Sequence, residues 1–297
     1  MEYRKSVRSA LRPRTLFASA YPVLMVVSLV HKSHSISLIQ LDVLTVLGCA
    51  IVTQLLWNLN TIYSNFQRTL QPKNSGTTDA KIVLNLLSLT QVRRWSYLFL
   101  SFQLMLIGLT HIICAKESKV TGCIIALVIL AFICCRRGDM PLPIVGLREA
   151  VIAWAAGPVS MLSTSYYLVT EVPWSVVLYA YIVMHFTWAF LLLKSATDAP
   201  FARRMGQPDT SLALRLGFKL TFQGFLLTMV LFYGIISVTG LAFGHLGNFF
   251  LLATIVKLKD ISEDFRLERL HHLPDQLAKL AVVLGAGLII SILTGLA

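Results

Sequence analysis

The sequence contains nine apolar runs, separated by short polar segments. A helix needs about 20 predominantly apolar residues to cross a bilayer, and helices or closed barrels alone satisfy their own backbone hydrogen bonds there. Hydrophobic residues make up 56% of the chain and charged residues 13%, which excludes a soluble enzyme. We therefore predict an all-α, multi-span integral membrane protein. The runs are centred near Met25, Val52, Met105, Leu127, Trp154, Met184, Leu227, Phe250 and Leu288.

The basic residues fall almost entirely on one side of such a nine-span arrangement. Of the 26 Lys and Arg residues, 23 lie in the N-terminal segment or in alternate connections, and the other 3 are Lys32, Lys116 and Lys119. By the positive-inside rule, this asymmetry predicts a cytoplasmic N-terminus and a C-terminus on the outer side. No low-complexity tract or soluble domain interrupts the pattern, so residues 1–297 are predicted to form one transmembrane domain.

Polar side chains crowd the predicted cytoplasmic end of the second run, which reads NLNTIYSNFQR from Asn58 onward. Asn60, Ser64 and Arg68 recur every four residues and share one helix face, whereas Asn58 and Asn65 share another. One interpretation is an interfacial helix end solvated by lipid head groups, because polar residues cost little free energy there. The other is a binding site at the end of the span.

A second polar segment follows the sixth run. It begins at Lys194 and contains Asp198, Arg203 and Arg204. Lys194 lies four residues before Asp198, so the two side chains share a helix face and could form an ion pair. The basic residues could also have no ligand and only fix the orientation of the chain in the membrane, since Lys and Arg are common at cytoplasmic helix ends.

The order of these segments resembles the UbiA superfamily of intramembrane prenyltransferases, particularly its menaquinone-type branch. In that family two Asp-rich motifs, N-D-x-x-D-x-x-x-D after the second helix and D-x-x-x-D after the sixth, lie on the cytoplasmic side. Asn60 falls where the first motif should start, and the segment from Lys194 to Arg204 falls where the second should be. Weaker similarities extend over most of the chain, at residues 141–149, 157–158, 206–217 and 273–279.

The resemblance implies nine transmembrane helices around a central cavity. It also implies a prenyltransferase that joins the chain of an isoprenyl diphosphate to a lipophilic acceptor, aromatic or otherwise. Two alternatives remain open. One is a membrane terpene cyclase, in which the donor folds back on itself. The other is a non-catalytic homologue that binds an isoprenoid or an anionic lipid, or serves as a partner subunit of an active enzyme.

This sequence departs from the family at the carboxylates that hold Mg²⁺. The three Asp positions of the first motif hold Thr61, Ser64 and Arg68, and in the second motif only Asp198 is acidic. Neutral oxygens do not replace the lost negative charge. A single carboxylate binds Mg²⁺ weakly, because this ion gives up its water ligands reluctantly. Asp198 is therefore the one acidic metal ligand that the resemblance leaves, and two of the other positions hold basic residues, Arg68 and Lys194.

We predict that the basic side chains bind a diphosphate or another anionic head group through charge-assisted hydrogen bonds, without a metal ion. Asp198, Asn60 and Ser64 are the candidate catalytic residues, because they occupy the motif positions that still carry oxygen ligands. The predicted diphosphate-binding residues are Arg68, Lys194, Arg203 and Arg204. The predicted cavity-lining residues are Asn58, Asn65, Tyr63, Tyr166 and Trp188.

Other polar residues are assigned structural roles. Asp260, Glu263 and Asp264 are predicted to form a solvated helix face together with Lys257, Arg266 and Arg269. His185 lies in the middle of the sixth run and is predicted to be a hydrogen-bonded packing residue. Nothing indicates a nucleic-acid partner beyond the positive charge that topology already explains.

Overall fold

The computed structural model contains helices and their connections, with no strand in the part of the chain that it describes. This confirms the all-α prediction for those residues. The predicted fourth span, near Leu127, and Arg68 lie outside them. Two compact units are present: unit 1 comprises residues 1–20 and 39–141, and unit 2 comprises residues 21–38 and 142–297. The described residues are 11, 13–37, 39–67, 88–112, 146–204 and 212–295.

In unit 1, two long helices pack along one another: α3 (Leu41–Gln67) and α5 (Leu89–Ile112). Their contact is apolar, with Leu59 and Ile62 of α3 buried against Val92 of α5. Leu11, Tyr63 and Phe99 cover the edge of this cluster.

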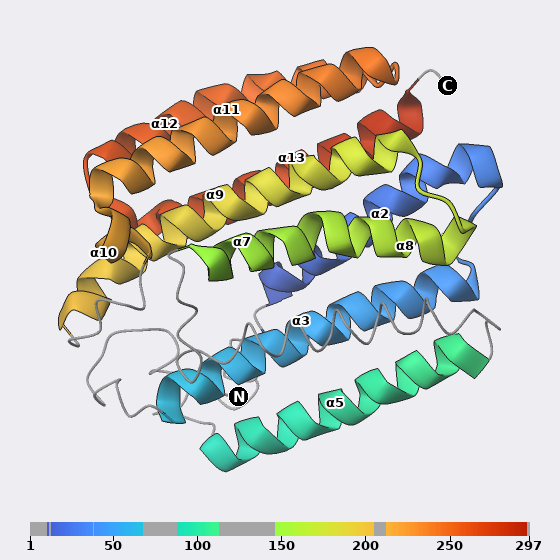
Figure 1. Ribbon diagram of the computed structural model, residues 1–297, viewed down its shortest axis with the longest axis horizontal. Coiled ribbons are helices and arrows are strands. Elements are labelled where there is room, and N and C mark those ends of the chain that lie inside the picture. Colours follow the sequence, from blue (N-terminus) through green and yellow to red (C-terminus); the bar gives the residue numbers. More distant parts are fainter. Residues whose placement is uncertain are drawn as a thin grey trace, which may run out of the picture. The chain divides into compact units, whose positions relative to one another are not determined.

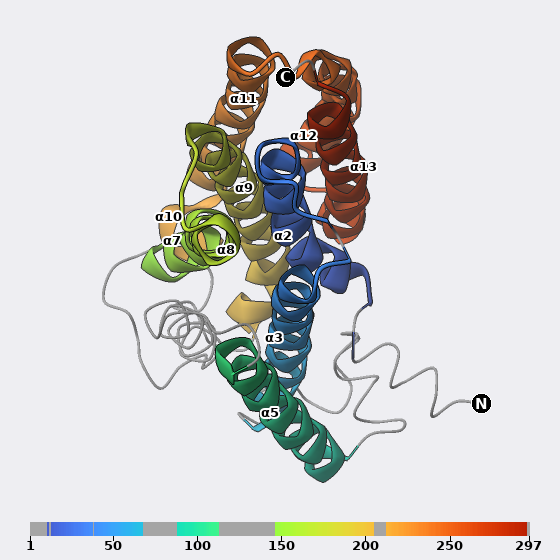
Figure 2. The same ribbon diagram turned by 90° about the vertical axis from the view of Figure 1, so that its right-hand side faces the viewer.

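Unit 2 is built around α9 (Trp174–Arg204), which runs antiparallel to both α11 (Phe218–Ala242) and α13 (Leu273–Thr294) (Figure 1). Figure 2 shows α9 with α8, α11 and α13 on different sides of it. The other elements of the chain are α2 (Pro13–His34), which enters unit 2 at Tyr21, α7 (Leu147–Trp154), η1 (Ala155–Val159), α8 (Ser160–Val169), α10 (Leu212–Leu216), η3 (Leu246–Thr254), α12 (Ile255–Arg266) and η4 (Leu270–His272).

The predicted fifth span is a helix with a π-helical turn, η1, between α7 and α8. Pro158 lies inside this turn and has no backbone N–H to donate, which favours a local change in the hydrogen-bond register. The neighbouring Gly157 lets the turn approach α9 closely. A Cβ atom at this position would lie 2.5 Å from the carbonyl oxygen of Ala180 and 2.7 Å from the backbone nitrogen of Met184.

Four segments of the described chain are long and apolar enough to cross a membrane, by length and composition: Leu41–Tyr63, Trp174–Pro200, Phe218–Ala242 and Leu270–Thr294. They correspond to the predicted second, sixth, seventh and ninth spans. The predicted eighth span forms η3, a 3-10 helix, and continues into α12. The count of nine membrane crossings stays a prediction.

Large apolar side chains remain exposed on the long helices. On α11, for example, Leu227, Val230 and Leu241 are 62%, 69% and 73% exposed. Contiguous apolar surface of this kind needs a partner, which lipid chains supply to a helix that spans a bilayer.

Candidate functional site

The second polar segment lies within the last turns of α9, which continues unbroken from Trp174 to Arg204. Trp174 is 76% exposed at the opposite end of the helix, as expected of an aromatic residue at a membrane boundary. At a rise of 1.5 Å per residue, Lys194 lies about 30 Å further along the helix, which is the thickness of the hydrocarbon core. If Trp174 marks one membrane boundary, Lys194 would lie near the other, with Asp198 one turn beyond it.

The structure places the side chains of this segment in different environments. Lys194 and Asp198 are both half-buried on one face of α9, whereas Arg203 is exposed. The side chain of Arg204 is outside the described part. One base and one acid therefore occupy a half-buried face at the end of the helix.

The short helix α10 packs against this end of α9. The backbone N–H of Ala213 donates a buried hydrogen bond of 2.9 Å to Ser195 Oγ. Leu212 and Ala213 are each only 5% exposed. Since Ser195 and Asp198 are three residues apart on a helix, α10 is attached directly beside the position of Asp198.

The start of α7 reaches the same region. Gly146, which precedes α7, has a φ of 81°, in the left-handed region that favours glycine. A Cβ atom at this position would lie 3.4 Å from Leu212 Cδ1 of α10. Three segments of unit 2 therefore converge here: the last turns of α9, α10 and the start of α7.

The first polar segment lies at the end of α3, in unit 1. The side chain of Asn58 is 1% exposed. Its Oδ1 accepts a hydrogen bond from Gln54 Nε2 at 3.0 Å, and its Nδ2 donates to the backbone oxygen of Leu11 at 2.9 Å. These bonds join α3 to the N-terminal segment of unit 1.

The remaining residues of the first segment are less enclosed. Asn60 is half-buried, and Thr61 donates its hydroxyl to the backbone oxygen of Trp57, in its own helix, at 2.8 Å. Tyr63 is half-buried against the apolar cluster of unit 1. The side chains of Ser64 and Asn65 lie outside the described part. That the first and second segments form one site stays a prediction, as does the central cavity.

Two predicted cavity-lining aromatic residues lie in unit 2. Trp188 is half-buried on α9, and Tyr166 is 37% exposed on α8. The neighbouring Tyr167 is only 1% exposed. His185 hydrogen-bonds through Nδ1 to the backbone oxygen of Tyr181 in its own helix, at 2.7 Å; its assignment as a packing residue stays a prediction.

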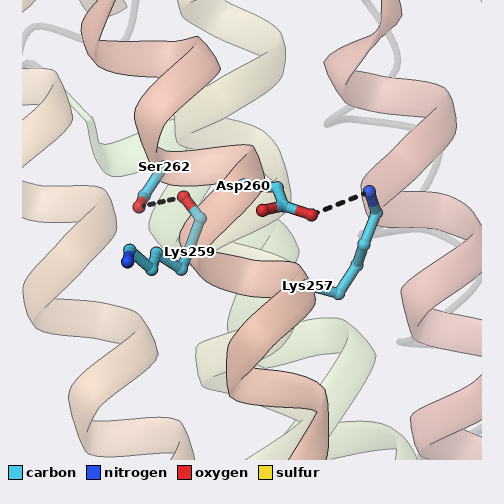
Figure 3. A network of polar contacts seen from close by, with 4 residues as sticks. All are labelled: Lys257, Lys259, Asp260 and Ser262. Atoms are coloured by element: carbon cyan, nitrogen blue, oxygen red, sulfur yellow. Dashed lines mark hydrogen bonds and ion pairs between the residues drawn. The ribbon is translucent and has the colours of Figure 1, made fainter.

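Two of the three acidic residues of α12, Asp260 and Asp264, form ion pairs with basic residues named in the prediction. Lys257 Nζ lies 3.3 Å from Asp260 Oδ2, and both side chains are more than half exposed (Figure 3). Arg269 lies 3.8 Å from Asp264 at the end of the helix. The hydroxyl of Ser262 donates to the backbone oxygen of Lys259 at 2.8 Å, on the same helix.

Among the described residues, no group of three or more His, Cys, Asp or Glu side chains is arranged to hold a metal ion. Asp198 is the one acid in the described part of the second segment. Mg²⁺ requires near-octahedral oxygen coordination and usually a second carboxylate or substrate phosphates. This set of described donors does not fit a Mg²⁺ ion held by the protein alone.

Taken together, the long apolar helices and the polar end of α9 define an integral membrane protein of the all-helical class. Two solved structures share its fold. One is of digeranylgeranylglyceryl phosphate synthase in membranes, with a TM-score of 0.63 and 13% identity over 99% of both chains. The other is the apo structure of a UbiA homolog from Aeropyrum pernix K1, with a TM-score of 0.67 and 12% identity over 92% of this chain and 97% of that one.

At these identities the likeness shows the fold, a UbiA-type helical fold that extends over nearly the whole chain. No protein-family model matches the sequence, and no curated protein matches it either. Function must therefore be argued from the residues at the site.

Proposed function

We propose that this protein is an intramembrane prenyltransferase that transfers the chain of an isoprenyl diphosphate to a lipophilic acceptor. One observation carries the proposal: Lys194 and Asp198 are both half-buried on one face of the last turns of α9, in a chain with a UbiA-type fold. A donor with an apolar tail and an anionic head fits such a position. Its tail lies in the bilayer and its head lies beside the lysine.

The reaction needs stabilisation of the leaving group. The allylic C–O bond breaks, diphosphate departs with the bonding electrons, and a nucleophilic atom of the acceptor attacks the carbocation and later loses a proton. A cation placed beside the developing negative charge lowers this barrier. Lys194 is the described residue that we assign to this role, with Arg203 contributing at longer range.

The assignment of the first segment belongs to this proposal as well. Asn60 and Ser64 would contribute neutral oxygens and donors around the same diphosphate, and Arg68 and Arg204 would add positive charge. Asp198 would orient Lys194 or contact the donor. These roles follow from the motif positions in the sequence, and they support a site that binds diphosphate mainly through basic groups.

The direct test uses the purified full chain in nanodiscs. Radiolabelled geranyl, farnesyl and geranylgeranyl diphosphate are supplied with an extract of lipophilic acceptors, and release of diphosphate is measured for the wild type and Asp198→Asn. The proposal predicts release that depends on the acceptor and falls in the variant. Cyclised hydrocarbon made without acceptor would identify a terpene cyclase instead.

A second candidate function is supported by the scarcity of acids. Among the described residues of the two segments, Asp198 alone is acidic. A site with so few acids suits a protein that binds an isoprenoid diphosphate or an anionic lipid but does not catalyse a reaction. Donor binding with no diphosphate release from the wild type, in Mg²⁺ or in EDTA, would favour this function over the enzyme.

A further inference from the structure

We propose that Ser195 is a positioning residue, whose hydroxyl fastens α10 to the end of α9 and so keeps Lys194 and Asp198 in place for an anionic head group. This inference rests on the proposed function for its consequence, but the fastening itself is a property of the fold. It is carried by the hydrogen bond from the Ala213 N–H to Ser195 Oγ, at 2.9 Å.

The end of α9 needs support because it contains a proline. Pro200 lies within the helix and has no N–H, so it cannot donate to the carbonyl of Ala196, four residues earlier. A proline inside a helix also crowds the preceding turn, and that turn contains Asp198. An isolated helix would fray or kink here, yet α9 continues to Arg204.

α10 supplies this support from outside the helix. It is a single short helix, Leu212–Leu216, with too few internal hydrogen bonds to be stable alone. Ala213 is its second residue, and the first N–H groups of any helix have no partner within it. Ser195 Oγ satisfies one of them in a buried environment, where an unpaired N–H is costly. Each helix therefore stabilises the other.

The attachment point is close to the proposed anion-binding residues. Ser195 is adjacent to Lys194 in the sequence and lies beside Asp198 on the helix surface. A shift of α10 would therefore change the last turns of α9, where the direction of both charged side chains is set. Hydrogen bonds to a ligand weaken when their distances and angles change.

Thr197 provides a matched control two residues away. Its hydroxyl also lies on α9 and is half-buried, but it donates to the backbone oxygen of Leu193 in the same helix, at 3.0 Å. Removing the Thr197 hydroxyl leaves the contact between α9 and α10 intact. Both Ser195→Ala and Thr197→Val remove a hydroxyl from α9, but only Ser195→Ala removes the hydrogen bond between α9 and α10.

Hydrogen–deuterium exchange tests the fastening without assuming any activity. The full chain in nanodiscs is compared as wild type, Ser195→Ala, Ser195→Thr and Thr197→Val, with peptides that cover residues 194–199 and 212–216. We expect exchange in both peptides to rise on the order of tenfold in Ser195→Ala, which is the loss of one net hydrogen bond. It should stay unchanged in Thr197→Val. Unchanged exchange in Ser195→Ala overturns the inference.

Titration with geranylgeranyl diphosphate tests the consequence. Donor affinity should fall on the order of tenfold in Ser195→Ala and be retained in Ser195→Thr, which keeps the hydroxyl, and in Thr197→Val. If exchange rises in Ser195→Ala while donor affinity stays at the wild-type level, Ser195 is structural and the positioning role is wrong. If the wild type itself does not bind the donor, the proposed function fails, and the exchange data still decide whether Ser195 fastens α10.

Discussion

The side-chain nitrogen of Asn248 donates a hydrogen bond to the phenol oxygen of Tyr179 at 2.9 Å, although 69 residues separate the two in the sequence. The same nitrogen donates to Thr239 Oγ1 at 3.0 Å, and the Tyr179 phenol lies 2.8 Å from His245 Nδ1. Asn248 and Tyr179 are both fully buried. One carboxamide therefore joins η3 to α9 and α11 inside unit 2.

Replacing Asn248 by Leu should destabilise the protein by about 1–3 kcal/mol, because the buried hydroxyls of Tyr179 and Thr239 would each lose a partner. Thermal unfolding in detergent, followed by the loss of the monodisperse peak, measures the change. Thr294→Val is the control, since the Thr294 hydroxyl is exposed and bonds to Ile290 in its own helix. Equal melting temperatures for the two variants would contradict the prediction.

Phe265 should be the residue that holds α12 against α11. Its ring is fully buried and lies edge-on to Phe218, Phe222 and Phe225, with centroid distances of 5.3, 5.4 and 5.3 Å. Phe265→Ala should cost about 3–5 kcal/mol of unfolding free energy, as large core deletions do.

The control for this deletion is Phe250→Ala, which removes a ring that is 84% exposed. Surface substitutions of this kind usually change stability by about 0.5 kcal/mol or less. Denaturant titration of both variants gives the comparison. A small effect at Phe265 would show that the aromatic cluster does not support α12.

Gly157→Ala should separate η1 from α9. The added methyl group would meet the backbone of Ala180 and Met184 at under 3 Å, and backbone atoms cannot move aside as a flexible side chain can. By contrast, Gly234 has nothing within 4 Å of an added Cβ atom. Gly234→Ala should therefore be neutral, or stabilising by up to about 1 kcal/mol through helix propensity. A stability assay in which both substitutions behave alike would count against this packing.

Lys194→Gln should weaken binding of an isoprenyl diphosphate by roughly 10- to 100-fold, because charge-assisted hydrogen bonds contribute about 1.5–3 kcal/mol. Binding to the variant should also depend less on salt concentration. Titrations of wild type and variant at several salt concentrations measure both effects.

Lys257→Gln is the matched control for the loss of one positive charge. Lys257 is 54% exposed and pairs with Asp260 on the surface of α12. Its removal should leave donor affinity within about twofold, since exposed ion pairs contribute little. An equal loss in both variants would indicate a general effect of net charge and would remove Lys194 from the site.

Sequence patterns located the long helices because their signal is local. The runs around Val52, Met184, Leu227 and Leu288 each contain enough consecutive apolar residues to require a membrane or a buried core. The run around Phe250 was predicted to be a helical span, and it forms a 3-10 helix that continues into α12; composition does not distinguish this geometry from an α-helix. That this run crosses the membrane stays a prediction.

The contacts that organise the candidate site were not predictable in the same way. Ser195 meets Ala213 only because the chain folds back on itself after α9, and Asn58 meets Leu11 across 47 residues. Contacts between residues so far apart leave no periodic pattern in the sequence. The Lys257–Asp260 ion pair, in contrast, follows from three-residue spacing on one helix, and it was predicted correctly.

The length of α9 has a consequence for how the protein would meet its ligand. Its 31 residues extend over about 46 Å, more than the hydrocarbon thickness, so Lys194 would lie near an aqueous boundary while the apolar turns before it remain in the bilayer. An amphiphile bound there would arrive by lateral diffusion. The fraction of protein with bound amphiphile would then depend on the mole fraction of the amphiphile among the surrounding lipids. Dissociation constants measured at different lipid-to-protein ratios would agree only when they are expressed as that mole fraction.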